Sequence, residues 1–427
     1  MSSKWKEISL DQALDINPSV KMQKGDAYPF VDMQTIEAGN KFVSPMQTRE
    51  FKGSGSRFVD GDTLMARITP CLENGKISRY RSMDKTPAHG STEFIVLRHR
   101  DKVTAPEFVY YLTISDQVKP FAIAQMTGSS GRQRVPVDAF KRLTVTLPRL
   151  KEQQAIAEIL RTLDDKIELN RQMCETLEKT AAALFRSWFV DFDPVRAKME
   201  GRTPEGMSAD LLSLFPDRFE DSELGAIPSG WKISEIGKLV DAVGGSTPST
   251  KNPVFWDGKH FWATPKDLSA LTHRVLLNTE RKITDKGLNE ISSGLLPEGT
   301  VLLSSRAPIG YVAVAEVPVA INQGLIAMKP SKKLGTQFAL HWTIENLEKI
   351  KSHANGSTFQ EISKGAFRPL KVCCPPHKLL ESFEQIASSL HVRCVELVRQ
   401  NNTLTKTRDA LLPKLISGEL RVEDVEG

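Results

Sequence analysis

The sequence has no long apolar run: none approaches the ~20 residues that a helix needs to cross a bilayer. Its first residues, MSSKWKE, also lack the apolar core of a secretory signal peptide. Hydrophobic residues make up 40% of the 427 and charged residues 26%, which is typical of globular proteins. We therefore expect a cytoplasmic protein without a membrane partner, and the length predicts two or more domains.

Cysteine is scarce and poorly placed for disulfides or metal binding. Of the five cysteines, Cys71, Cys174 and Cys394 are isolated in the sequence, and Cys373 and Cys374 are adjacent. Adjacent cysteines have a poor geometry for either a disulfide or a zinc knuckle. The sequence therefore predicts reduced structural thiols and no metal site.

Catalytic motifs are missing as well. The chain has no phosphate-binding loop pattern and no HExxH pattern, and its eight histidines are scattered. Residues 252–255 (NPVF) are similar to the NPP-aromatic motif of adenine methyltransferases but lack its second proline. A PD…ExK nuclease site would have to join residues 216–217 to residues 280–282 across a long separation. We predict no catalytic residue and no cofactor on this chain.

Two stretches carry an apolar repeat with a spacing of seven residues. The members of the first are Ile156, Leu163, Asn170, Leu177 and Leu184. The members of the second are Phe383, Leu390, Leu397, Leu404 and Leu411. Such spacing predicts two long helices, each about 60 Å long at ~1.5 Å per residue, and a long helix cannot bury its apolar stripe alone. We expect the two to pack together, antiparallel, as a coiled coil; two independent core helices are the alternative.

The repeat extends beyond the helices. Trp231-Lys232 matches Trp5-Lys6, residues 298–306 match residues 61–67, and residues 354–360 match residues 127–133. Short apolar runs bounded by turn residues predict strands in each copy. The fold class is therefore α/β (α+β), a duplicated module with an internal pseudo-two-fold repeat. We place its parts at 1–149 (first globular domain), 150–193 (long helix), 194–227 (linker), 228–376 (second globular domain) and 377–427 (second long helix and tail).

Polar and basic residues gather in loops of both globular domains. Hydroxyl groups suit phosphate contacts, and Arg, Lys, Asn and Gln suit base edges in the major groove. The candidates in the first domain are Arg67, Ser129, Arg132, Gln133 and Arg134. Those in the second are Ser246, Thr247, Lys251, Lys266, Arg306, Gln323 and Gln360. The net charge of +5 permits nucleic-acid binding without demanding it, and for any single candidate a solvated surface role is the alternative.

Several runs resemble the specificity subunits of Type I restriction–modification enzymes, and the resemblance covers essentially the whole chain. Residues 163–172 (LDDKIELNRQ) and 183–195 (ALFRSWFVDFDPV) are similar to that family's central helix, and residues 411–420 (LLPKLISGEL) to its distal counterpart. Residues 304–310 (SSRAPIG) look like one type of target-recognition domain, whereas residues 66–76 (ARITPCLENGK) match another variant. That difference is expected if the two domains recognise different half-sites.

The resemblance implies a non-catalytic subunit that binds double-stranded DNA. Each target-recognition domain would bind one half of a split sequence, and the helices would set the spacer. Two modification subunits would dock on the helical regions and methylate adenine with S-adenosylmethionine, while restriction subunits would use ATP and Mg²⁺ to translocate and cleave DNA. A coiled-coil scaffold that binds only proteins is the alternative function.

An aromatic cluster at the end of the first long helix fits such docking. Its members are Phe185, Trp188, Phe189 and Phe192. Packing against the linker or against the other long helix is the alternative role for these side chains.

Overall fold

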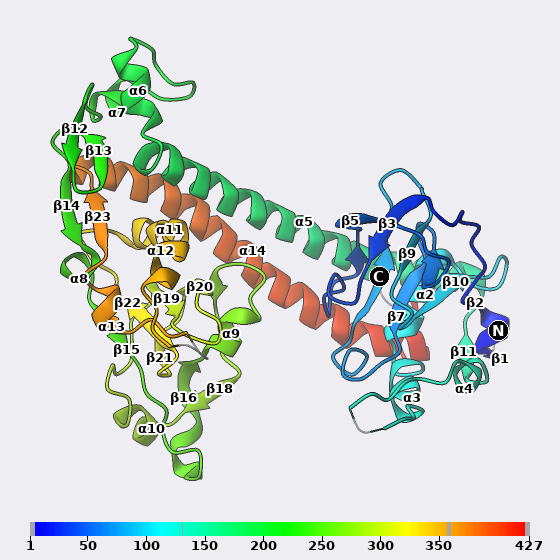
Figure 1. The fold of residues 1–427 in the computed structure, drawn as a ribbon. Helices are drawn as coiled ribbons and strands as arrows, with labels where there is room; N and C mark the ends of the chain where they lie inside the picture. Colours follow the sequence, from blue (N-terminus) through cyan, green and yellow to red (C-terminus); the bar gives the residue numbers. More distant parts are fainter. Residues whose placement is uncertain (1–4, 130, 357–359, 423–427) are drawn as a thin grey trace. The chain divides into compact units, whose positions relative to one another are not determined.

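The computed structural model describes residues 5–129, 131–356 and 360–422 and divides into two compact units (Figure 1). Unit 1 comprises Met1–Glu168 and Asn401–Gly427, and unit 2 comprises Leu169–Gln400. Each long helix therefore contributes one part to each unit. No helix within the described ranges is long and apolar enough to span a membrane.

The two units contain the same five-stranded mixed sheet. In unit 1 its order is β2-β10-β7-β8-β4, and in unit 2 it is β15-β22-β19-β20-β17. In both sheets the first three neighbouring pairs are antiparallel and the last is parallel. The strands of unit 1 are β2 (Leu14–Ile16), β4 (Phe42–Val43), β7 (Thr63–Ala66), β8 (Ile77–Tyr80) and β10 (Phe94–His99). Those of unit 2 are β15 (Ala242–Gly244), β17 (Val275–Leu276), β19 (Thr300–Ser304), β20 (Val312–Ala315) and β22 (Leu325–Met328). This shared order confirms the duplicated module.

The smaller sheets also correspond. In one, β3 (Ala27–Val31) pairs antiparallel with β5 (Gln47–Glu50) and parallel with β9 (Ala88–Gly90), which also pairs with β6 (Ser56–Phe58). In the other, β16 (Trp256–Ala263) pairs antiparallel with β18 (Arg281–Ile283) and parallel with β21 (Val319–Ile321). A two-stranded ribbon precedes each long helix, formed by β1 (Lys6–Ser9) with β11 (Thr144–Leu147) and by β14 (Lys232–Glu235) with β23 (Lys371–Cys374).

Central strands in both units are buried along their whole length. All four residues of β7 and all five of β19 are buried, because a helix covers one face of each sheet and the second sheet or loops cover the other. The covering helices are α2 (Pro106–Ile114) and α11 (Thr336–Glu345), and α2 begins with proline at a position where its missing N–H costs nothing. Other short helices are α1 (Leu10–Ala13), α3 (Lys119–Ala124), α4 (Val137–Lys141), α8 (Ile236–Leu239), α9 (Pro265–Ser269), α10 (Asp285–Asn289), α12 (Leu347–Ser352) and α13 (Lys364–Phe367).

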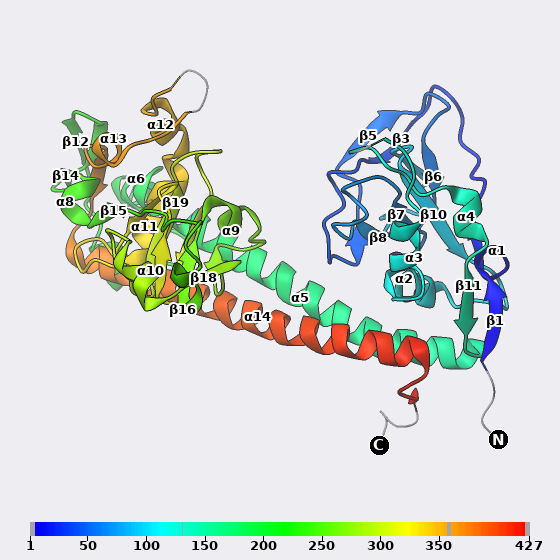
Figure 2. The same cartoon turned by 90° about the horizontal axis from the view of Figure 1, so that it is seen from below.

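The long helices are α5 (Leu150–Phe189) and α14 (His377–Ser417), and they pack antiparallel within each unit (Figures 1 and 2). In unit 1, Asp164 of α5 meets Arg408 of α14. In unit 2, Phe185 meets Phe383. A later position in α5 therefore pairs with an earlier one in α14, which confirms the predicted antiparallel pairing. None of the ten residues of the seven-residue repeats is exposed. Asn170 is fully buried and donates a 2.7 Å hydrogen bond to Gln400.

The end of α5 and the segment after it differ from the prediction. The helix ends at Phe189 rather than at residue 193, because Phe192 adopts a left-handed conformation with φ 56° and a new helix, α6 (Asp193–Met199), begins behind it. Residues 194–227, which the sequence assigned to a linker, are folded. They form α6, α7 (Ala209–Ser213) and a hairpin of β12 (Phe219–Ser222) with β13 (Gly225–Pro228). Val195, Phe215 and Ile227 from this segment are buried in the core of unit 2.

Two of the cysteines are not isolated. Cys174 of α5 and Cys394 of α14 lie opposite each other with their Cα atoms 4.9 Å apart, and a disulfide joins them. The prediction of reduced thiols is therefore wrong for this pair. The sequence did not show the pair because 220 residues separate its members and only the antiparallel packing brings them together. Cys71, Cys373 and Cys374 are free.

Candidate nucleic-acid interface

In unit 1 the candidate residues come together where β7 ends. The backbone N–H of Val135 donates to the carbonyl of Arg67 at 2.9 Å, and Thr127 and Arg134 exchange backbone hydrogen bonds of 2.9 and 3.0 Å. These bonds hold Thr127, Arg134 and Val135 against the turn after β7. Gln133 is fixed at this turn because its N–H donates to Thr69 Oγ1 at 2.9 Å.

Arg67 lines a polar cavity of about 470 Å³. Its Nε is buried and has no hydrogen-bond partner among the described residues. The other polar or charged side chains that line this cavity are Asn17, Ser19, Ser56, Arg57 and Thr92. A buried donor without a partner is costly, so an incoming acceptor, such as a phosphate oxygen or the O6 and N7 atoms of guanine, would be stabilised here.

Arg134 is already held by a carboxylate. Its Nε and Nη2 donate to Glu93 at 2.7–3.0 Å, and this hydrogen bonding raises the pKa of Arg134 above its ordinary value. By contrast, Ser129 and Arg132 are exposed at the tip of the loop, and Arg132 makes no ion pair with any described residue. In unit 1, Arg134 is therefore held in place by a carboxylate, whereas Arg132, two residues earlier, has no ion-pair partner among the described residues.

Unit 2 builds the same backbone scaffold. Ser305 N–H donates to the carbonyl of Gly324 at 2.8 Å, as Arg67 N–H does to that of Glu93 at 2.9 Å. Ile362 N–H donates to the carbonyl of Ser305, and Asn355 and Glu361 exchange backbone bonds, which reproduces the pattern around residues 127–135. Ser305 is thus the counterpart of Arg67, and Arg306 lies one position further along its loop.

Arg306 faces an acidic side chain across this scaffold. Its Nη1 lies 3.5 Å from Glu361 Oε2, and its side chain is 37% exposed. Gln360, the neighbour of Glu361, is exposed. The structure therefore brings Arg306 and Gln360 together at the same end of the domain.

The glycine-rich loop after β15 is held against the turn between β21 and β22. Ser246 N–H donates to Ile321 O at 3.1 Å, and the hydroxyl of Thr247 donates to the side-chain oxygen of Gln323. Gly245 is required here, since a Cβ atom would lie 1.8 Å from the carbonyl oxygen of Ile321. Ser246, Thr247 and Gln323 are thereby gathered at one place.

The two lysine candidates lie on segments that adjoin this turn. Lys251, toward the end of the glycine-rich loop, is exposed and makes no ion pair with any described residue. Lys266 in α9 pairs with Glu280 at 2.7 Å, and this hydrogen bond raises the pKa of Lys266. Pro265 of the same helix packs against Gly324. Both cations therefore flank the polar end of the second domain.

Sequence reasoning missed the carboxylates that hold the arginines. Glu93 lies 41 residues before Arg134, and Glu361 lies 55 residues after Arg306. No local pattern links the members of either pair. The only usable signal was the internal repeat, since it placed the loops that contain Arg134 and Glu361 at matching positions.

The aromatic cluster at the end of α5 is packed rather than displayed. Phe185, Trp188 and Phe189 are 3%, 2% and 7% exposed. The half-buried Phe192 contacts the rings of Phe219 and Trp231. The rings pack against Phe383 of the other long helix and Phe215 of the segment after α5, which is the alternative role that the sequence left open, and the docking role stays a prediction.

Residues 4–179 and 228–404 each match the model of one family, described as type I restriction modification DNA specificity domain. The chain belongs to this family. Each matched segment covers one globular domain and a large part of the long helix that follows it, so both copies of the module are family members.

Curated relatives extend this likeness over the whole chain. The chain is 28% identical to the Type I restriction enzyme HindI specificity subunit of Haemophilus influenzae, over 98% of this chain and 100% of that protein. It is 34% identical to the Type I restriction enzyme MjaIX specificity subunit of Methanocaldococcus jannaschii over 44% of each chain. A solved Type-I restriction-modification S subunit from M. genitalium has a TM-score of 0.51 at 16% identity, covering 97% of this chain and 96% of that one, and supports the fold alone.

Proposed function

We propose that this chain is the DNA specificity subunit of a type I restriction–modification enzyme and that each globular domain binds one half of a split site. The observation that carries the proposal is the shared scaffold with different side chains. The loop after β7 presents Arg67, and its counterpart after β19 presents Arg306 one position later. One scaffold carrying two side-chain sets suits two half-sites of different sequence.

Six of the candidate residues divide by chemistry into two groups. The exposed and uncommitted cations Arg132 and Lys251 suit phosphate contacts, which position the protein without selecting a sequence. Arg306, Gln133, Gln323 and Gln360 carry bidentate groups that match the edges of guanine or adenine. The carboxylate of Glu361 keeps the guanidinium of Arg306 oriented until a base takes its place.

The chemistry of methylation and cleavage resides, in this proposal, on partner subunits that bring S-adenosylmethionine, ATP and Mg²⁺. The modification subunits dock on the long helices. Because the aromatic cluster is buried, docking uses other apolar side chains of α5 and α14 in unit 2. Leu169, Ile386 and Val392 are 49%, 38% and 55% exposed, and a partner that covered these side chains would remove their apolar surface from water.

A binding experiment with the modification subunit tests this function. We expect the complex to bind one split sequence about 10³–10⁷ times more tightly than unrelated duplex DNA, with an affinity that falls steeply as salt rises. Fluorescence anisotropy on a duplex library at several salt concentrations measures both. A flat salt response without sequence preference would support the protein-only scaffold, and methyl transfer by the isolated chain would support an enzyme.

Arg306→Ala is expected to relax the base preference at one position of a single half-site, at a cost of about 1–3 kcal/mol for the preferred base. The other half-site should be unchanged, because unit 1 retains its own scaffold. Arg393→Ala is the matched control, since Arg393 is also a partly exposed, ion-paired arginine of unit 2 but lies on α14. Uniform weakening on every sequence would assign Arg306 to phosphate instead.

A further inference from the structure

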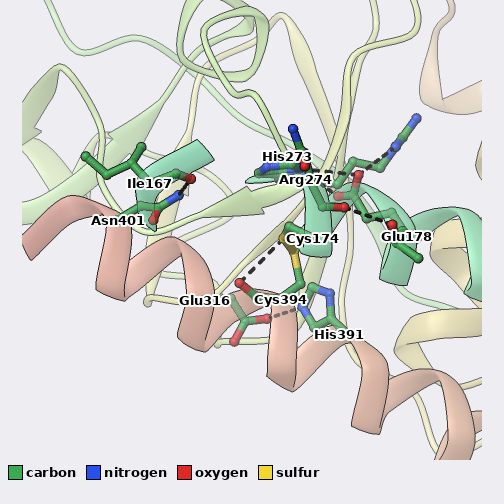
Figure 3. Close-up of a disulfide and its surroundings, with 11 residues drawn as sticks. Ile167, Cys174, Glu178, His273, Arg274, Glu316, His391, Cys394 and Asn401 are labelled. Atoms are coloured by element: carbon green, nitrogen blue, oxygen red, sulfur yellow. Dashed lines mark hydrogen bonds and ion pairs between the residues drawn. A yellow bond between two sulfur atoms is a disulfide. The ribbon is translucent and has the colours of Figure 1, made fainter. Parts of the chain in front are cut away.

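Three side chains of metal-binding type meet inside unit 2. Cys174 comes from α5, Cys394 from α14, and His273 from the segment just before β17 (Figure 3). One ring nitrogen of His273 and the two sulfur atoms all lie within 4.8 Å of one another. Both cysteines are 1% exposed. In the structure the sulfurs are joined as a disulfide, so the cluster is seen in its oxidised form.

The surroundings of His273 leave one nitrogen available. Nδ1 lies 3.7 Å from the carboxylate of Glu178, which also accepts a 2.7 Å hydrogen bond from the backbone N–H of Arg274. Nε2 is buried and has no hydrogen-bond partner among the described residues, and the side chain is only 9% exposed. A buried nitrogen without a partner is costly. A carboxylate beside the opposite ring nitrogen is the outer arrangement that commonly orients a metal-bound histidine.

Neighbouring polar groups do not compete for this nitrogen. His391, one turn before Cys394 on α14, is already engaged, because its Nε2 lies 2.8 Å from Glu316 (Figure 3). Glu178 is turned to His273 and Arg274 (Figure 3). The two sulfurs and one imidazole are therefore the donors that face one another, and thiolate with imidazole is a donor set that favours zinc over magnesium or calcium.

We propose that, after reduction of the disulfide, Cys174, Cys394 and His273 bind one Zn²⁺ ion, with water as the fourth ligand. A phosphine or dithiol reductant supplies two electrons, two protons come from water, and the S–S bond is replaced by two thiols. Zn²⁺ then displaces both thiol protons to solvent and forms two Zn–S bonds and one Zn–N bond. The bound ion would fasten the segment before β17 to both long helices of unit 2. This proposal does not rest on the proposed DNA-binding function.

The dimensions are compatible with such a site. Zn–S bonds of about 2.3 Å and Zn–N bonds of about 2.0 Å in a tetrahedron place neighbouring ligand atoms roughly 3.6 Å apart. In the structure the ligand atoms lie within 4.8 Å of one another. Side-chain rotations that move these atoms by about an ångström, together with separation of the sulfurs on reduction, bring the ligands to tetrahedral distances.

Metal titration of the full chain tests the proposal. The chain is reduced with a water-soluble phosphine, freed of metal, and titrated with Zn²⁺ against a chromophoric chelator and, separately, with Co²⁺. We expect one equivalent of either ion to bind, release of two protons, and thiolate-to-cobalt charge-transfer absorption. Oxidised wild-type chain should bind neither ion here, and it provides a control that carries no substitution and retains the fold.

Variants assign the ligands. Cys174→Ser and Cys394→Ser should each abolish the charge-transfer signal expected for two thiolates, and His273→Gln should weaken binding and shift the visible cobalt bands. Glu178→Gln should weaken binding roughly 10–100-fold, as loss of an outer partner does. Cys71→Ser and the double variant Cys373→Ser with Cys374→Ser are controls that should leave binding unchanged, and circular dichroism checks that every variant is folded.

Three outcomes would overturn the proposal. The first is reduced wild-type chain that binds neither ion, which would leave the pair as a structural disulfide only. The second is binding that the His273→Gln variant does not alter. The third is binding that disappears in the Cys373 and Cys374 double variant.

Discussion

Arg408→Ala is expected to destabilise unit 1 by about 3–5 kcal/mol, because it leaves a buried carboxylate without its partner. Arg408 Nη1 lies 2.8 Å from Asp164 Oδ1, and the two side chains are 9% and 3% exposed. The hydroxyl of Tyr111 donates to the other oxygen of Asp164 at 2.7 Å. Burial, together with the charge of Asp164, raises the pKa of Tyr111, so this donor stays protonated.

Denaturant unfolding of the full chain, combined with hydrogen exchange on peptides of unit 1, measures this loss. Arg161→Ala is the matched control on α5, since Arg161 pairs with Glu158 and Asp165 at the surface and surface pairs contribute at most ~1 kcal/mol. The double variant Arg408→Met with Asp164→Leu should recover much of the stability, because both charges of this buried pair are removed together. Equal losses in Arg408→Ala and Arg161→Ala would contradict the buried ion pair.

Phe185→Ala is expected to destabilise unit 2 by about 3–5 kcal/mol through the cavity that it leaves. The ring of Phe185 lies 5.1–5.7 Å, between centroids, from those of Phe189, Phe338 and Phe383, which belong to α5, α11 and α14. The substitution therefore removes a side chain that joins both long helices to the globular part of the unit.

The same unfolding measurement on unit 2 checks this result. Leu169→Ala is the control, because Leu169 is a large apolar residue of the same helix but is 49% exposed, so its removal should cost little stability. In the proposed assembly the order of the two variants is reversed for docking. Leu169→Ala, which costs little stability, should weaken binding of the modification subunit. A Phe185→Ala variant that keeps its stability but no longer binds the modification subunit would instead assign the aromatic cluster to the docking interface.

Local patterns accounted for the features that the sequence predicted well. The seven-residue repeat through Ile156 and Phe383 is a property of neighbouring residues on one helix face, so the presence of two long helices and their partnership followed from it. The duplication was visible because matching segments recur in the same order. The folded segment 194–227 was missed, since its glycines and prolines are typical of linkers and only tertiary packing buries Val195 and Phe215.

The sequence predicted which loops carry the candidate interface, but not which side chains form ion pairs within it. Composition identified the segments that contain Arg134 and Arg306, and the backbone scaffold then brought their members together. The partners Glu93 and Glu361 depend on contacts between distant strands and loops, which no local window contains. The Cys174–Cys394 pair was hidden for the same reason: its members are adjacent only through the register of two antiparallel helices.

In the proposed function, two copies of one DNA-binding module recognise separate half-sites at a spacing set by the paired helices. Inserting seven residues after Glu168 in α5 and seven after Gln400 in α14, where the two units meet along the chain, keeps the helical phase and adds about 10 Å to each helix. Methylome sequencing of cells that express this variant with its modification subunits should show the same two half-sites separated by about three additional base pairs, at ~3.4 Å per base pair. An unchanged gap, or half-sites of different sequence, would contradict the claim.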